Sequence, residues 1–132
     1  FRRVLFRSMI LSYLSAHPSF YEKIRDILTE QDFPTPPYDQ IASLLLDQLR
    51  HGKLNLSGMI SSFEETEDQE KAAELFYEAQ PEETGEVLQK LLLDCVLNLR
   101  RHSLETRIAR EQDIGKVLEL RKEQEKLGEI RF

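Results

Sequence analysis

Apolar residues recur three and four positions apart along almost the whole chain, and this spacing predicts helices rather than strands. Strands would need runs in which β-branched and aromatic residues alternate with polar ones, and the sequence contains no convincing run of that kind. Two apolar stripes come first, separated by Pro18, which ends the first helix. Their members are Leu5, Met9, Tyr13 and Leu14, and then Phe20, Ile24, Ile27 and Leu28.

Three more short helices follow the proline-rich stretch "DFPTPPYD", in which Phe33 is expected to anchor a fixed loop. The first of them ends at Gly52, which we expect in the left-handed conformation that closes many helices. Ser57 is expected to cap the second, and the third covers "QEKAAELFYEA" before Pro81 stops it. Five short amphipathic helices in succession predict a helical bundle.

One helical signal then runs without a proline from about residue 82 to residue 112. Its first half has a broad apolar face, whereas beyond Arg100 only a narrow stripe of Leu104, Ile108 and Ala109 remains. After the turn "DIGK", a last helix carries a narrow seam that suits one partner helix, so the two helices predict an antiparallel hairpin. The broad face consists of Leu88, Leu92, Cys95, Val96 and Leu99, with Leu91 widening it, and the last seam consists of Val117, Leu120, Gln124 and Leu127.

The predicted fold is therefore all-α, with a bundle of short helices followed by a long helix and a C-terminal antiparallel helical hairpin. We place the bundle at residues 1–99 and the hairpin at residues 100–132. The chain has 132 residues, a length that suits one domain, and its 32% charged residues are typical of a well-solvated helical fold.

Charge is unevenly distributed along the chain, which carries a formal net charge of −6. Residues 59–86 hold ten acids against the single base Lys71, and residues 87–132 hold ten bases against eight acids. An acidic stretch repels phosphates and a mixed one is typical of a solvated helix surface, so we expect no direct binding to nucleic acid. No apolar run reaches the roughly 18 residues of a membrane span. The single Cys95 and the lack of a secretory leader lead us to expect a cytoplasmic location.

Catalytic and metal chemistry finds little support in the residue pattern. The three histidines lie on separate elements, and neither a His-Glu-x-x-His nor a Cys-x-x-Cys motif occurs, so we expect no metal. Cys95 lies in an apolar stripe, where a reactive thiolate is disfavoured, and no glycine-rich phosphate loop is present. We expect no cofactor and no catalytic residue.

One enzymatic alternative stays open. The side chains of Arg100, Arg101, Arg107 and Glu111 would grip a small dianion in a helix-lined pocket, as in the all-helical chorismate mutases. Helical spacing spreads these residues around the helix, which favours a solvated face instead.

Binding to a partner protein is the interpretation we favour for the C-terminal hairpin. In a pair of helices, each helix can bury only one apolar stripe against the other. Apolar residues outside these stripes, such as Leu118, Ile130 and Phe132, are therefore expected to stay partly exposed. Hairpins of this kind dock on partner helices through apolar anchors inside a charged rim. The alternative is that the tail folds back over the bundle or frays in isolation.

The order, lengths and apolar pattern of the elements resemble the C-terminal helicase-binding domain of bacterial DnaG-type primases. The resemblance covers nearly the whole chain and rests on three stretches rather than on an invariant motif. They are "MILSYLSAHPSFYEKI", "LTEQDFPTPPYDQIASLLLDQLRHGKLNLSGMISSFE" and "LLLDCVLNLRRHSLETRIAREQDIGKVLELRKEQEKL".

The resemblance implies a non-catalytic module of a primase. Its hairpin would dock on the N-terminal domains of the hexameric replicative helicase, and its bundle would help to stimulate that helicase and modulate priming. The seam pattern, not a family motif, supplies the expected contact residues: Ile108, Glu111, Ile114, Val117, Leu118, Arg121, Leu127 and Ile130.

Two further alternatives belong to this resemblance. The N-terminal domain of the replicative helicase itself resembles the primase bundle in fold, and "HPSFYEKIRDILTEQDF" would suit it as well. A dimer formed by swapping the hairpin between two copies is also compatible with the sequence.

Overall fold

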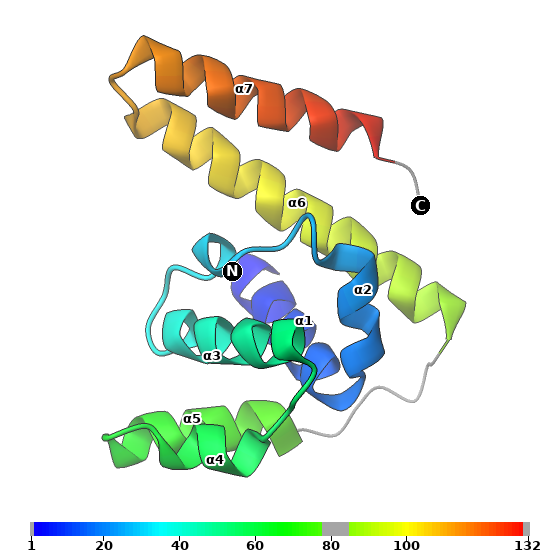
Figure 1. Cartoon of the computed structure of the whole chain (residues 1–132), viewed down its shortest axis with the longest axis vertical. Coiled ribbons are helices and arrows are strands. Elements are labelled where there is room, and N and C mark those ends of the chain that lie inside the picture. Colours follow the sequence, from blue (N-terminus) through cyan, green and yellow to red (C-terminus); the bar gives the residue numbers. More distant parts are fainter. Residues whose placement is uncertain (1, 78–84, 131–132) are drawn as a thin grey trace.

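The computed structural model describes residues 2–77 and 85–130, with side chains from Arg7 onward, and this part of the chain is built from helices and loops (Figure 1). The predicted all-α fold is therefore confirmed, and no strand occurs within the described ranges. The elements in chain order are α1 (Arg2–Ala16), η1 (Pro18–Phe20), α2 (Tyr21–Ile24), η2 (Glu30–Asp32), α3 (Tyr38–His51), α4 (Leu56–Ser61), α5 (Thr66–Tyr77), α6 (Glu86–Arg110) and α7 (Ile114–Glu129).

Helix α1 runs through the centre of the bundle, where it contacts α3, α5 and α6 (Figure 1). Helices cover it from several sides, and the six consecutive residues 10–15 are accordingly all buried, which a single apolar stripe would not produce. Met9, which the stripe prediction placed inward, is 36% exposed, so that assignment was wrong. The side chain of Leu5 lies outside the described residues.

The second predicted stripe is buried in full, on η1, α2 and the loop after them. Its four members pack in the same core as Phe33, which has no exposed surface and holds the proline-rich loop against the bundle. This position of Phe33 agrees with the sequence prediction.

Two of the helix ends test local sequence signals. Gly52 adopts the predicted left-handed conformation at φ 69° and closes α3. Asn55, not Ser57, caps α4: its Oδ1 accepts a hydrogen bond from the Gly58 amide at 3.0 Å, and Ser57 lies inside the helix. Both residue types are good caps, but Asn55 directly precedes the first helical turn. In α5 the buried residues are Ala72, Leu75 and Phe76, whereas Ala79 and Pro81 lie outside the described residues.

Helix α6 has 25 residues and spans about 37 Å. The structure begins it at Glu86 and ends it at Arg110, while residues 82–84 of the predicted helix lie outside the described ranges. Leu91, predicted to widen the apolar face, is 51% exposed, so that assignment was wrong. Leu93 and Leu97 are buried instead, because the first half of α6 packs on α1 and η2 while α7 covers its other side further along. The buried arc therefore widens on the side away from Leu91.

Helix α7 lies alongside the second half of α6 and runs in the opposite direction (Figure 1). The connection is shorter than predicted, because Asp113 already caps the helix: its Oδ1 accepts from the Gly115 amide at 2.8 Å. Leu120 and Leu127 are buried and share the apolar core with Leu104 of α6, which has no exposed surface. We call this arrangement the α6–α7 pair, meaning α6 from Arg100 onward together with α7. None of the described helices combines the length and apolar character needed to cross a membrane.

Candidate functional site

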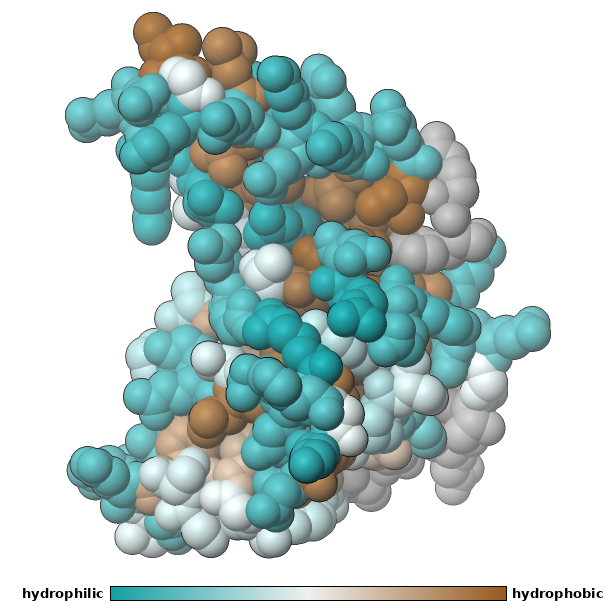
Figure 2. Space-filling model, in the orientation of Figure 1, coloured by the Kyte–Doolittle hydropathy of each residue, from teal (hydrophilic) through white to brown (hydrophobic). Residues whose placement is uncertain are grey.

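The most exposed apolar residues of the α6–α7 pair lie at the start of α7. Ile114 is 77% exposed and Leu118 is 56% exposed, and a spacing of four residues puts them on one side of the helix. Arg121 and Glu125 continue this side toward the C-terminus, and both are exposed. We call these four residues the α7 outer face. Figure 2 shows hydrophobic atoms over the start of α7 with hydrophilic side chains around them.

The inner side of α7 explains why this surface stays free. Leu120 and Leu127 are spaced seven residues apart, so they face α6 together, and Val117 and Gln124 flank them half-buried. Only this one stripe of α7 packs against α6, so Ile114 and Leu118, on another side of the helix, are exposed to solvent.

The eight predicted contact residues therefore fall into three groups. Ile114, Leu118 and Arg121 are exposed, and the first two form the apolar part of the outer face. Ile108, Val117, Ile130 and Glu111 are half-buried. Leu127 is buried at 6% exposure inside the α6–α7 contact, so it lies on the inner side of α7 and not on its outer face; the contact set stays a prediction.

Glu111 serves the turn between the two helices. Its Oε1 accepts hydrogen bonds from the backbone amides of Gln112 and Asp113, both at 3.1 Å. The turn is thus held by two carboxylates in sequence, Glu111 for the connection and Asp113 for the cap of α7. This fixes where α7 begins and therefore where Ile114 emerges.

A polar cluster around η2 connects α6 to the bundle. Asp32 is fully buried, and Thr29 and Asp32 form a capping box in which Asp32 Oδ2 accepts from the Thr29 amide at 2.9 Å. Arg7 Nε donates to the Asp32 carbonyl oxygen at 3.0 Å, and Arg107 Nη1 donates to Gln31 Oε1 at 3.0 Å. Side chains from α1 and α6 therefore meet on this single short turn.

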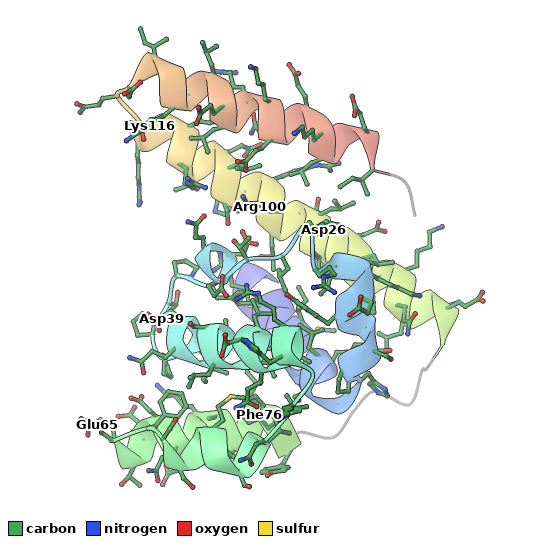
Figure 3. The ribbon with its side chains drawn as sticks, viewed as in Figure 1. Asp26, Asp39, Glu65, Phe76, Arg100 and Lys116 are labelled. Carbon is green, nitrogen blue, oxygen red and sulfur yellow. The ribbon has the colours of Figure 1, made fainter. Side chains whose placement is uncertain are left out.

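Arg100, which Figure 3 labels on α6, also belongs to the cluster. It is 9% exposed. Its Nη1 is 3.5 Å from Asp32 Oδ1 and 3.4 Å from Thr29 Oγ1, and its Nη2 donates to Glu123 Oε2 at 3.0 Å. One guanidinium thus pairs with a carboxylate of the bundle and with a carboxylate of α7. The forked geometry of arginine makes this double contact possible.

A second arginine braces η2 from α3. Arg50 Nη2 lies 2.6 Å from Glu30 Oε1, and this hydrogen bond is the main cause that raises the pKa of Arg50 above its ordinary value. The same turn therefore receives charged side chains from three directions, which explains how a segment of three residues keeps a fixed position.

Three of the four residues considered for catalysis, Arg100, Arg107 and Glu111, are used in these structural contacts, and Arg101 is exposed. Arg100 pairs with Asp32 and Glu123, and Arg107 bonds to Gln31, so the two do not converge with Glu111 on a common pocket. Burial, and then the charge of Asp94, raise the pKa of the Cys95 thiol. Within residues 2–77 and 85–130, no cluster of three potential metal ligands is found.

Sequence reasoning missed the polar cluster and one further surface feature. The Thr29-x-x-Asp32 spacing was a readable signal for the capping box, whereas nothing in the sequence pairs Arg100 with Glu123. The further feature is a groove of about 600 Å³ between α3 and the loop joining α4 to α5. It is lined by Gln40, Ser43, Leu44, Ser62, Phe63, Glu64, Glu65 and Asp68.

Comparisons of this chain with protein-family models, with curated proteins and with solved structures found no match. The resemblance to the primase domain thus rests on the sequence pattern alone.

Proposed function

We propose that this chain is a non-catalytic interaction module that docks on the N-terminal domain of a hexameric replicative helicase through the α7 outer face. The observation that carries the proposal is the pair of exposed apolar side chains, Ile114 and Leu118, one turn apart on a helix that lies on the far side of α6 from the bundle (Figure 1). Apolar anchors inside a charged rim are the usual energetic centre of a helix-docking interface.

The resemblance to the DnaG-type primase domain supports the identity of the partner. It implies that the chain belongs to a primase, that the helicase is its partner, and that the bacterial cytoplasm is where the complex forms. Half-buried Val117 and Ile108 would enlarge the apolar centre, while Arg121 and Glu125 would form part of the rim.

The test uses two doubly substituted variants of the same chain. Ile114→Asp with Leu118→Asp should weaken binding to a panel of purified bacterial replicative helicase hexamers by at least about a hundredfold, because each aspartate would have to be desolvated in the interface. The affinity is measured by isothermal titration calorimetry, and circular dichroism checks that the bundle is intact.

Val87→Asp with Leu91→Asp is the matched control. These two residues are also four apart on one helix and are 77% and 51% exposed, but they lie at the opposite end of α6. The proposal expects the control to bind like the unchanged chain. Equal loss in both variants, or full binding by the Ile114 and Leu118 variant, would refute the site. Failure to bind any helicase, together with assembly of the chain with itself, would favour the helicase N-terminal domain instead.

Deletion after Leu99 is a poor substitute for these variants. It would remove Arg100 and leave the fully buried carboxylate of Asp32 without its guanidinium. Loss of binding by such a fragment would then mix loss of the docking surface with damage to the bundle.

A further inference from the structure

The two ion pairs of Arg100, with Asp32 and with Glu123, differ in how easily they can break. Asp32 has no exposed surface, so removal of the guanidinium would leave a buried carboxylate without this ion pair, which is strongly destabilising. The side chain of Glu123 is 49% exposed, so its carboxylate can return to water when it leaves Arg100. Arg100 would meanwhile keep Asp32 and Thr29 as partners.

The two residues that α7 buries are both apolar. Leu120 and Leu127 belong to the same buried apolar core as Leu104, but burial of apolar surface is non-directional and sets the position of a helix only loosely. A hydrogen-bonded ion pair has a defined distance and orientation. Glu123 Oε2 at 3.0 Å from Arg100 Nη2 therefore specifies how α7 lies along α6.

Arg100 is also fixed on its other side by the bundle. Its Nη1 faces Asp32 and Thr29 on η2, and η2 in turn receives Arg7 from α1 and Arg107 from α6. The position of the guanidinium is thus set by the bundle, and α7 is aligned to it through one half-exposed carboxylate.

We propose that the contact between Arg100 and Glu123 is a releasable latch that holds α7, and with it the α7 outer face, in one position relative to the bundle. The bundle retains the cation when the latch opens, and Glu123 is the side that moves. Release changes the position and dynamics of α7 without unfolding η2. The inference goes beyond the proposed function, because it holds for whatever partner the outer face binds.

The test compares two variants that remove the same carboxylate from the same helix. Glu123→Ala opens the latch, and Glu125→Ala is the control, since Glu125 makes no hydrogen bond or ion pair within the described part of the chain. Amide hydrogen exchange of the full chain is followed residue by residue by NMR, without any partner present. Exchange rates report the local opening of each segment.

The latch predicts an asymmetric result. In Glu123→Ala the amides of α7 from Leu118 to Leu127 should exchange about fivefold faster, as expected for losing one half-exposed charged hydrogen bond. The amides of Thr29, Asp32 and Phe33, which are bonded within η2 and its cap, should change by less than about twofold. Glu125→Ala should leave both regions unchanged.

Two outcomes would overturn the inference. If Glu123→Ala and Glu125→Ala give the same exchange in α7, the contact does not hold the helix. If the η2 amides accelerate together with α7, the guanidinium is not retained by the bundle, and the contact is a permanent brace rather than a latch. Neither outcome depends on helicase binding, so failure of the proposed function leaves this test unaffected.

Discussion

Replacing Arg100 by methionine should destabilise the fold far more than replacing an exposed arginine on the same helix. Methionine keeps most of the buried aliphatic stem but removes the cation that faces Asp32, which has no exposed surface. Removing one partner of a buried ion pair costs about 3–5 kcal/mol, because the other charge is left uncompensated.

The geometry places the expected loss near the lower end of that range. Arg100 Nη1 lies 3.5 Å from Asp32 Oδ1, a long contact, and Asp32 Oδ2 keeps its hydrogen bond from the Thr29 amide. The exposed side of the pair, at Glu123, contributes less than about 1 kcal/mol. We therefore expect Arg100→Met to lower the free energy of unfolding by about 3–4 kcal/mol, measured by urea denaturation with circular dichroism.

Two further variants make the reasoning refutable. Arg101→Met removes the same charge from an exposed neighbouring position and should stay within about 0.5 kcal/mol of the unchanged chain. Asp32→Asn combined with Arg100→Met removes the stranded charge while keeping an oxygen for the Thr29 amide, and should regain about 1–2 kcal/mol over Arg100→Met alone. The account fails if Arg100→Met matches Arg101→Met, or if the double variant is no more stable than Arg100→Met.

Two smaller predictions concern α4 and the buried thiol. Asn55→Ala should cost about 1 kcal/mol of unfolding free energy and Ser57→Ala less than about 0.5 kcal/mol, since Asn55 is the cap; the reverse order in urea denaturation would restore Ser57 as the cap. Burial raises the folded-state pKa of Cys95, so its contribution to stability is complete below the unfolded thiol pKa of about 8.5 and is lost as pH rises through the higher folded pKa. Urea denaturation at a series of pH values from below about 8.5 upward should show the free energy of unfolding falling in the unchanged chain but not in Cys95→Ala. The same pH dependence of the unfolding free energy in both chains would contradict this prediction.

Features that depend on a few neighbouring residues were predictable from the sequence. Gly52 ends α3 because glycine readily adopts the left-handed conformation that closes a helix. The seven-residue spacing of Leu120 and Leu127 was enough to identify the inner side of α7. Local signals still leave a choice where two good capping residues lie close together, as Asn55 and Ser57 do at the start of α4.

Features that depend on more than one neighbouring helix were not predictable in this way. The stripe prediction assumed a single packing partner for each helix, but α6 changes partner along its length, so Leu91 is exposed while Leu97 is buried. Charged residues were expected in solvent, yet Asp32 and Arg100 are both buried because each compensates the other. The pairing of each arginine with its carboxylate depends on how close η2, α6 and α7 lie in space. Residue spacing in the sequence does not predict these distances.

The position of Arg100 also bears on how the chain is divided. The predicted boundary between the bundle and the C-terminal pair falls after Leu99, and it stays a prediction, but the polar cluster begins at the very next residue. Helix α6 continues through this point without a break, and two of its arginines on the far side, Arg100 and Arg107, bond back to η2. A partner that binds Ile114 and Leu118 would therefore act on a helix pair that is braced against the bundle at two points. The contribution of each part can be separated only by point substitutions that leave these braces in place.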